Sequence, residues 1–142
     1  MDVQLTPMGR TALVSMPIVG GVLAGTTGFQ SPADDYLEDR IDLARELVTT
    51  KASTFCWRVT GDSFRDSGIF DGSIVVIDYS RTPKVGDIVL AKLGDGVTLK
   101  RLRMVHGQTC LTSDTRGYPV FPIDSNEGVL IFGVLKHSVL SF

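Results

Sequence analysis

The stretch "GDIVLAKLGDGVTLKRLRMV", residues 86–105, decides the fold class. Two runs that mix Val, Leu and Ile with polar residues flank the triplet Gly94-Asp95-Gly96. Runs of this kind are typical of half-buried β-strands, and glycines accept the positive φ that a tight turn requires. The stretch therefore predicts a β-hairpin.

Strand patterns recur on both sides of this hairpin, with turn signals between them. They are "TFCWRVTG" (54–61), "DGSIVVIDYS" (71–80), "QTCLTSD" (108–114) and "VLIFGVLKHSVL" (129–140). Short strands separated by turns favour antiparallel pairing over βαβ units. We therefore expect a mostly β, compact antiparallel domain, in which "SFRDSGI" (63–69) forms one or two short turns of helix.

The first part of the chain has a different composition. Residues 1–34 hold three of the six prolines and many glycines, so they predict an irregular N-terminal arm. Within it, "VSMPIVGGVLAG" (14–25) has the residues of a short extended piece, and its apolar content indicates that it packs on something. Residues 35–50 resume an apolar pattern, in which Asp42 can cap a helix over about 43–48.

Composition excludes several classes of protein. The 142 residues carry a formal net charge of −2 and no long basic run, so we do not expect direct nucleic-acid binding through a positive surface. Cys56 and Cys110 form no CxxC motif and have no histidine cluster, which predicts packed, reduced thiols and neither a metal site nor a cofactor. Pro17 and several glycines interrupt the apolar run 12–24, so we expect no export signal and no membrane anchor.

Ser63 is the candidate nucleophile. It follows Gly61 between a strand and a short helical turn, where a sharp turn can hold a hydroxyl out beside backbone N–H groups. An ordinary turn or helix cap is the simpler interpretation of the same residues. A nucleophilic serine also needs a base, and His106 and His137 lie in a loop and in the last strand without an obvious orienting carboxylate. A Ser-His arrangement stays open, without support from the pattern.

Lys100 is the other candidate base. Alternation along the second strand of the hairpin places it on one face with Thr98 and Leu102, and places Arg101 and Arg103 on the other. Burial among apolar groups favours the neutral amine that a base requires, and Ser-Lys pairs are one form of activated nucleophile. The simpler alternative is a strand lysine whose ammonium group reaches solvent.

Three blocks of sequence, in order, resemble the UmuD/LexA family of self-cleaving Ser-Lys peptidases. They are "GFQSPADDYLEDRIDL" (28–43), "VTGDSFRDSGIFDGSIVVID" (59–78) and "GDIVLAKLGDGVTLKRL" (86–102). The first resembles the UmuD segment after the cleavage site, and the others place Ser63 at the nucleophile and Lys100 at the general base. The resemblance implies a β domain of the LexA/UmuD C-terminal type. It favours the UmuD branch, because the short preceding segment has no helix pair that could read an operator.

The resemblance also implies a mechanism, a domain division and partners. Lys100 would take the proton of Ser63, which attacks a bond of the arm, while backbone N–H groups at Asp62 and Ser63 hold the oxyanion. Residues 1–27 would be the arm that is removed or displaced on activation, and residues 28–142 the Ser-Lys peptidase-like domain. The family acts in the cytoplasm as a homodimer in the SOS response. RecA filaments on single-stranded DNA stimulate it, and it then serves a Y-family, UmuC-like translesion polymerase, with no membrane and no direct sequence-specific DNA binding.

Two positions depart from the family pattern. Phe64 follows the nucleophile where the family usually has methionine, so a large apolar side chain is kept. The block resemblance puts the cut at Thr27–Gly28, where the family usually has Cys-Gly or Ala-Gly, and a β-branched residue fits a small pocket less easily. The bond Ala24–Gly25 has the preferred residues but lies three positions earlier.

Two other functions stay open at this point. A UmuD-like binding module would keep the fold and the dimer but regulate a polymerase by occupancy, without cutting itself. A signal peptidase of the membrane-anchored type shares the Ser-Lys chemistry, and the missing anchor pattern argues against it.

Overall fold

A computed structural model describes most of the chain after residue 52. Described with their side chains are residues 2–8, 47–48, 53–94, 96–123 and 128–142, and described as backbone are residues 15–19 and 37–42. The chain divides into two compact units, Met1–Gly9 with Thr50–Phe142, and Arg10–Thr49.

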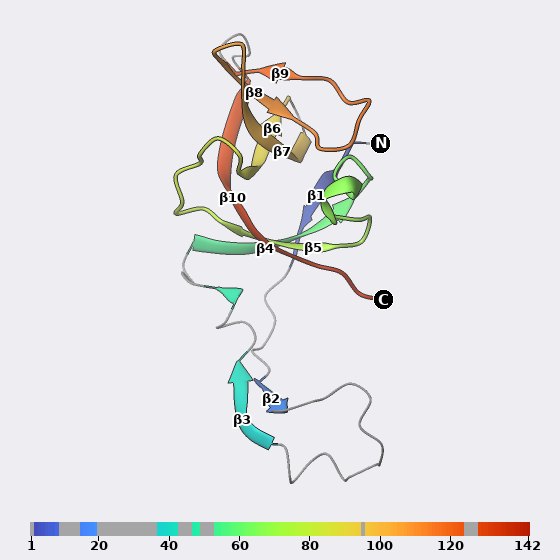
Figure 1. Cartoon of the computed structure of the whole chain (residues 1–142), viewed down its shortest axis with the longest axis vertical. Helices are drawn as coiled ribbons and strands as arrows, with labels where there is room; N and C mark the ends of the chain where they lie inside the picture. The colour runs from blue at the N-terminus through green and yellow to red at the C-terminus, as the bar shows by residue number, and fades with distance from the viewer. Residues whose placement is uncertain are drawn as a thin grey trace. The chain divides into compact units, whose positions relative to one another are not determined.

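The larger unit is built on one eight-stranded antiparallel sheet, with strand order β1-β4-β5-β10-β6-β7-β8-β9 (Figure 1). The strands are β1 (Gln4–Pro7), β4 (Thr54–Thr60), β5 (Ile74–Asp78), β6 (Ile88–Leu93), β7 (Gly96–Val105), β8 (Gln108–Thr112), β9 (Phe121–Pro122) and β10 (Val129–Val139). One short 3₁₀ helix, η2 (Arg65–Ser67), lies between β4 and β5. The predicted fold class, a mostly β antiparallel domain with short helices, is therefore confirmed.

The hairpin predicted from residues 86–105 forms as β6 and β7. Leu93 pairs with Gly96 at the turn, and Gly94 adopts a φ of 62°, a conformation that glycine reaches without a steric cost. Further along the two strands, Val89 pairs with Lys100. The hairpin register thus fixes where Lys100 lies in the sheet.

The sheet curls so that its edge strand β1 also contacts β7, which is far from it in the strand order. The main core lies between these strands. Its buried residues are Val3, Leu5, Val59, Phe64, Ile69, Val75, Ile77, Leu90 and Leu99. A second cluster contains Val89, Ala91, Leu102, Leu111 and Val134. The nucleophile block and the base block both contribute to the main core, so its packing brings them together.

The N-terminal segment differs from its prediction. Residues 4–7 form β1, which pairs antiparallel with β4, so the expectation of an irregular arm is wrong there. The physical reason is burial: Val3 is fully buried and Leu5 is 9% exposed, and both pack into the main core. Burying two such side chains contributes about 3–6 kcal/mol, which outweighs the weak strand preference of the surrounding residues.

The smaller unit contains a two-stranded antiparallel pair, β2 (Ser15–Val19) with β3 (Leu37–Asp42). Strand β2 agrees with the predicted extended piece within residues 14–25. Asp42 ends β3 as a strand residue, and the helix predicted over 43–48 lies largely outside the described residues.

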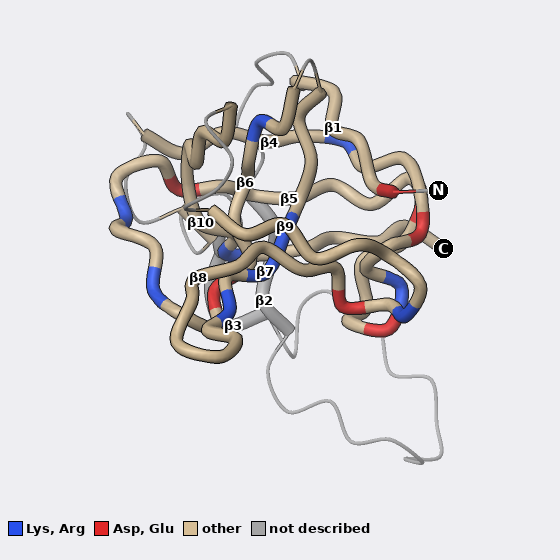
Figure 2. The backbone as a smooth tube through the Cα atoms, turned by 90° about the horizontal axis from the view of Figure 1, so that it is seen from above, with Lys and Arg blue, Asp and Glu red and all other residues tan. Residues whose placement is uncertain are grey.

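The two cysteines differ in their surroundings. Both are free; Cys110 is buried, as predicted, whereas Cys56 is exposed. The packing prediction is wrong for Cys56 because it shares the solvent-facing side of β4 with the exposed residues Arg58 and Thr60. Acidic and basic residues are interspersed along the described chain (Figure 2). In the part of the chain that the structure describes, no helix combines the length and hydropathy needed to cross a membrane.

Gly133 lies in β10, where it pairs with Leu90 of β6. Its missing side chain lets β10 lie close to Ile77 and Asp78 of β5. A Cβ atom at this position would lie 2.8 Å from the carbonyl oxygen of Asp78 and 2.8 Å from Cγ2 of Ile77. We expect Gly133→Ala to lower the free energy of unfolding by about 1–3 kcal/mol, because the backbone of β5 must shift. Chemical denaturation measures this loss. The control Gly96→Ala meets open space and should change stability by less than half as much.

Candidate active site

Ser63 lies on the turn that joins β4 to η2. Gly61 begins this turn with a φ of 105°, which an L-residue rarely adopts, and its N–H donates to the carboxylate of Asp71 at 3.0 Å. The carbonyl of Ser63 accepts the N–H of Thr115 at 3.0 Å, which ties the turn to the loop after β8. Ser63 itself is fully buried. The turn is therefore held at both ends, as expected for a residue that must keep one orientation.

Lys100 lies in the middle of β7 and is fully buried. Thr98 and Leu102 on the same face are buried too. On the other face Leu99 is fully buried, so both faces of this part of β7 are covered, and Arg103 further along is exposed. The ammonium group does not reach solvent, which excludes the simpler alternative for this residue. Its Nζ donates to the Oγ of Ser113 at 2.8 Å and lies 5.3 Å from the ring centre of Phe121.

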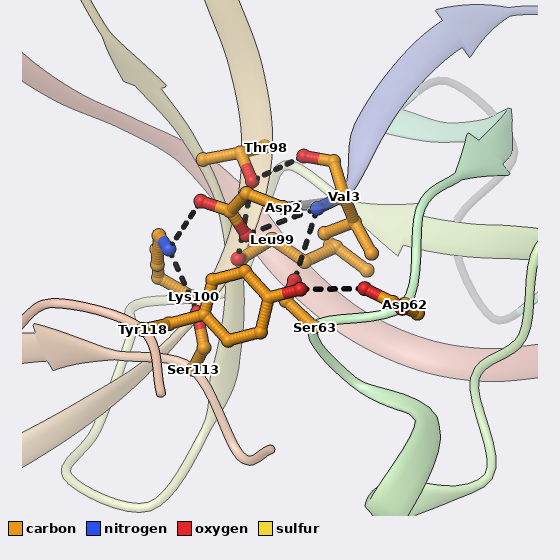
Figure 3. A network of polar contacts seen from close by, with 9 residues as sticks. All are labelled: Asp2, Val3, Asp62, Ser63, Thr98, Leu99, Lys100, Ser113 and Tyr118. Atoms are coloured by element: carbon orange, nitrogen blue, oxygen red, sulfur yellow. Dashed lines mark hydrogen bonds and ion pairs between the residues drawn. The ribbon is translucent and has the colours of Figure 1, made fainter. Parts of the chain in front are cut away.

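Two consecutive residues of the N-terminal segment connect the serine and the lysine (Figure 3). The N–H of Val3 donates to Ser63 Oγ at 2.9 Å, and the carboxylate of Asp2 accepts Lys100 Nζ at 2.6 Å. The Oγ of Thr98 donates to the carbonyl of Val3 at 2.6 Å. Because neighbouring Cα atoms are about 3.8 Å apart, Ser63 and Lys100 lie within one site.

The loop after β8 supports both side chains. Arg101 forms a bidentate ion pair with Asp114. Its Nε donates to Oδ1 at 2.7 Å and its Nη2 donates to Oδ2 at 2.6 Å. Asp114 also accepts the hydroxyl of Ser67 from η2. This ion pair fixes the loop next to Ser113, the residue that holds Lys100 Nζ.

Asp62, the neighbour of Ser63, is held through its side chain. Tyr118 Oη donates to Asp62 Oδ1 at 2.5 Å. This hydrogen bond is the largest cause of a pKa of Asp62 that is lowered to about 2 and of a pKa of Tyr118 that is raised to about 12. The pair stabilises the folded state above the ordinary pKa of an aspartate, and that contribution is lost as the pH falls towards 2. At the alkaline end it is lost as the pH rises from about 10 towards 12.

We therefore expect the phenol of Tyr118 to lose its proton at a higher pH than an ordinary tyrosine. In the ultraviolet absorbance of tyrosinate, Asp62→Asn should return the pKa of Tyr118 towards the ordinary value of about 10, because the carboxylate acceptor is gone. Tyr118→Phe should remove the phase near 12 altogether. The exposed Asp66→Asn serves as the matched control and should leave the titration unchanged. A phase near 12 that survives Tyr118→Phe would contradict the assignment.

The other predicted site residues are placed as follows. In the described part of the chain, the hydrogen bonds of Ser63 lead to Val3 and Thr115, and neither histidine is among these partners. His106 lies in the turn between β7 and β8, and His137 lies in β10 opposite Val76. The residues of both candidate cleavage bonds, Ala24–Gly25 and Thr27–Gly28, lie outside the described residues.

Sequence reasoning missed four residues of this site, namely Asp2, Val3, Ser113 and Tyr118. Asp2 lies 98 positions from Lys100, and no spacing rule connects positions so far apart. Ser113 and Tyr118 belong to the polar run "SDTRGY", residues 113–118, which directly follows a strand. That polar run was the available signal, because polar residues at a strand end often line a site.

The mostly antiparallel β fold is consistent with one class of serine peptidase. Residues 17–136 match the family model described as Peptidase S24-like, so the chain belongs to this family. It is 37% identical to protein MucA of Salmonella typhimurium over 116 residues, 81% of this chain and 79% of the relative. It is 36% identical to protein ImpA of Shigella flexneri over 114 residues, 79% and 76% of the two chains. LexA repressor 1 of Nocardia farcinica is 36% identical over 142 residues, 96% of this chain and 63% of the relative. The predicted membership in the UmuD/LexA family, in its UmuD branch, is confirmed.

Proposed function

We propose that this protein is a UmuD-like serine peptidase that cuts its own N-terminal arm, with Ser63 as nucleophile and Lys100 as general base. One observation supports the proposal above the others: both side chains are fully buried, and they contact adjacent residues of one extended segment. An activated nucleophile requires its base within hydrogen-bond reach, and the contacts of both side chains with Asp2 and Val3 place Lys100 in the neighbourhood of Ser63. The family membership of residues 17–136 agrees with it.

The proposed reaction balances as an ordinary acyl transfer. The neutral amine of Lys100 takes the proton of Ser63 Oγ, which bonds to the carbonyl carbon before the scissile nitrogen. Backbone N–H groups of Asp62 and Ser63 stabilise the resulting oxyanion. The C–N bond then breaks, and Lys100 returns the proton to the leaving amine of a glycine. Water hydrolyses the ester and regenerates Ser63. Since the substrate belongs to the same chain, tethering gives it a high effective concentration.

The finer biological role follows from the UmuD branch. We infer a cytoplasmic homodimer of the SOS response whose cleavage is stimulated by RecA filaments on single-stranded DNA. The cut dimer then serves as accessory subunit of a Y-family, UmuC-like translesion polymerase. RecA acts in this scheme by favouring a cleavable arrangement rather than by supplying catalytic groups. The division into an arm, residues 1–27, and a domain, residues 28–142, belongs to the same proposal.

The test is self-cleavage of the purified full chain. One sample is held at alkaline pH, which favours neutral lysine, and another receives RecA, single-stranded DNA and a nucleotide. Intact mass and N-terminal sequencing should reveal a new fragment that begins at Gly28 or Gly25. An intact, folded dimer in both samples would contradict the peptidase proposal and leave the binding module that acts by occupancy alone.

Substitutions at the two candidate bonds separate them. A pocket that accepts a small residue before glycine should reject a charged one. Thr27→Asp should therefore stop a cut at Gly28 and leave a cut at Gly25, and Ala24→Asp should do the reverse. Because both variants carry the same added charge, each is the control for the other.

A further inference from the structure

Strand β1 occupies the edge of the sheet next to the nucleophile. It pairs with β4 from Gln4 opposite Thr60 to Pro7 opposite Trp57, so its first residues lie at the end of β4 that leads into Ser63. On its other side it contacts β7, the strand that carries Lys100. Residues 2–7 thus lie between the strand before the nucleophile and the strand of the base.

Asp2 and Val3 form polar contacts with both proposed reactive groups, Lys100 Nζ and Ser63 Oγ (Figure 3). Ser63 Oγ accepts the N–H of Val3, and Lys100 Nζ is ion-paired with Asp2. The backbone of Val3 is held on its carbonyl side as well, by Thr98. This is how an extended peptide is bound in a groove: through backbone hydrogen bonds, with one buried side chain as an anchor.

The same contacts do not present a bond for cleavage. Ser63 Oγ accepts the Val3 N–H, so one of its two lone pairs is taken up by a nitrogen, and the group that lies against Oγ is an N–H rather than a carbonyl carbon. Attack on a peptide bond requires the hydroxyl oxygen to approach the carbonyl carbon, with its proton on the way to a base. Lys100 Nζ meanwhile donates to Asp2 and Ser113. Strand β1 is held as an occupant, in a position that blocks the site.

We propose that the place between β4 and β7 that residues 2–7 fill is a groove that binds an extended strand, and that β1 is its resident, inhibitory occupant. The inference rests on the proposed function, since the competing strand would be the arm segment that carries the scissile bond. That segment reaches Ser63 only after residues 2–7 have left the groove. Cleavage is then limited by exchange of one strand for another.

The anchoring of β1 is compatible with such an exchange. Four residue pairs and two buried apolar side chains hold it, and the side chain of Asp2 remains 37% exposed. Residues 2–4 also line a cavity of about 420 Å³ together with the β6–β7 hairpin and Phe121. An edge strand that borders open space can dissociate from the sheet. An incoming strand would then restore the backbone hydrogen bonds that β4 had made with β1.

A reversible crosslink tests the inference directly. Gln4 and Thr60 are exposed partners in the antiparallel register, where Cα atoms lie about 4.5–5.5 Å apart, within disulfide reach. The double variant Gln4→Cys with Thr60→Cys should lose self-cleavage at alkaline pH by more than tenfold when oxidised. A reducing agent should restore it. The single variants are the controls and should cut at one rate with or without reductant. An oxidised, crosslinked protein that cuts as fast as the reduced one overturns the inference.

A second variant loosens the strand instead. Asp2→Ala removes the ion pair with Lys100 and should raise the rate of self-cleavage roughly two- to fivefold, as expected for a pair whose carboxylate is 37% exposed. The matched control Asp66→Ala changes an exposed acid of η2 and should have no effect. Reaction of Ser63 with a fluorophosphonate supplies a readout that does not depend on the arm; Oγ bonds to phosphorus and fluoride leaves. Labelling should rise by the same factor.

The two readouts separate the two proposals. If labelling rises in Asp2→Ala and is blocked by the oxidised crosslink while no variant cuts itself, the inhibitory strand stands and the peptidase proposal fails. If the wild type cuts itself but neither variant changes cleavage or labelling, the peptidase stands and the inhibitory strand fails. The inference requires that loss of the Asp2 ion pair releases Ser63. It is overturned if the wild type and Asp2→Ala are labelled equally, or if neither is labelled.

Discussion

Lys100→Met is expected to stop self-cleavage while leaving the free energy of unfolding nearly unchanged or higher. The variant keeps an unbranched buried side chain of similar volume and loses the amine that, in the proposed mechanism, takes the proton from Ser63. We expect the rate to fall at least about 10³-fold, the scale on which removal of one member of such a catalytic unit acts. Ser63→Ala should give a similar loss, and the double variant should be no slower than either, because the two groups act as one unit.

The free energy of unfolding of Lys100→Met should not fall together with its activity. Lys100 is fully buried, whereas the side chain of its partner Asp2 is 37% exposed, so methionine leaves no buried charge without a partner. The free energy of unfolding should stay within about 1 kcal/mol of the wild type or rise. Lys92→Met, an exposed lysine of β6, is the matched control and should cut at the wild-type rate. Self-cleavage by Lys100→Met at an unchanged rate would remove Lys100 from the mechanism.

Among the variants proposed for this protein, Phe64→Ala is expected to lower the free energy of unfolding the most. Phe64 directly follows Ser63, is fully buried, and packs in the main core with Val3 and Leu5. Its carbonyl also accepts the N–H groups of Ser67 and Ile69, so the chain must keep its course through this turn. Truncating a buried phenylalanine costs about 3–5 kcal/mol through lost burial and the cavity that remains.

The comparison of three variants makes this prediction specific. Phe64→Met, which restores the residue usual in the family, should cost less than about 1.5 kcal/mol because its volume is similar. Phe142→Ala removes a fully exposed ring and should change the free energy of unfolding by less than about 0.5 kcal/mol. Denaturant unfolding followed by Trp57 fluorescence measures all three. Equal stability of Phe64→Ala and the wild type would contradict the core that the structure describes.

Local pattern was enough for most of the sheet. Alternation and turn residues predicted β4, β5, β8, β10 and the β6–β7 hairpin, because each depends on neighbours in sequence. Strand β9, of two residues, was missed, since Phe121–Pro122 is too short to show a period. Strand β1 was missed because it owes its form to Val3 and Leu5 entering a core whose other members come from residues 59–99.

The sequence by itself determined the fold class and the face of β7 that carries Lys100, and it singled out Ser63 and Lys100 as the candidate reactive residues. Residue type, alternation and the family blocks all act over short spans, and they do not depend on how distant strands meet. Only the tertiary structure decided what touches Ser63 and Lys100. The curl of the sheet brings β1 against β7, and the pairing of β1 with β4 sets Val3 on Ser63 and Asp2 on Lys100. Contacts between positions 60 and 98 residues apart follow from the closure of the sheet, which no local pattern encodes.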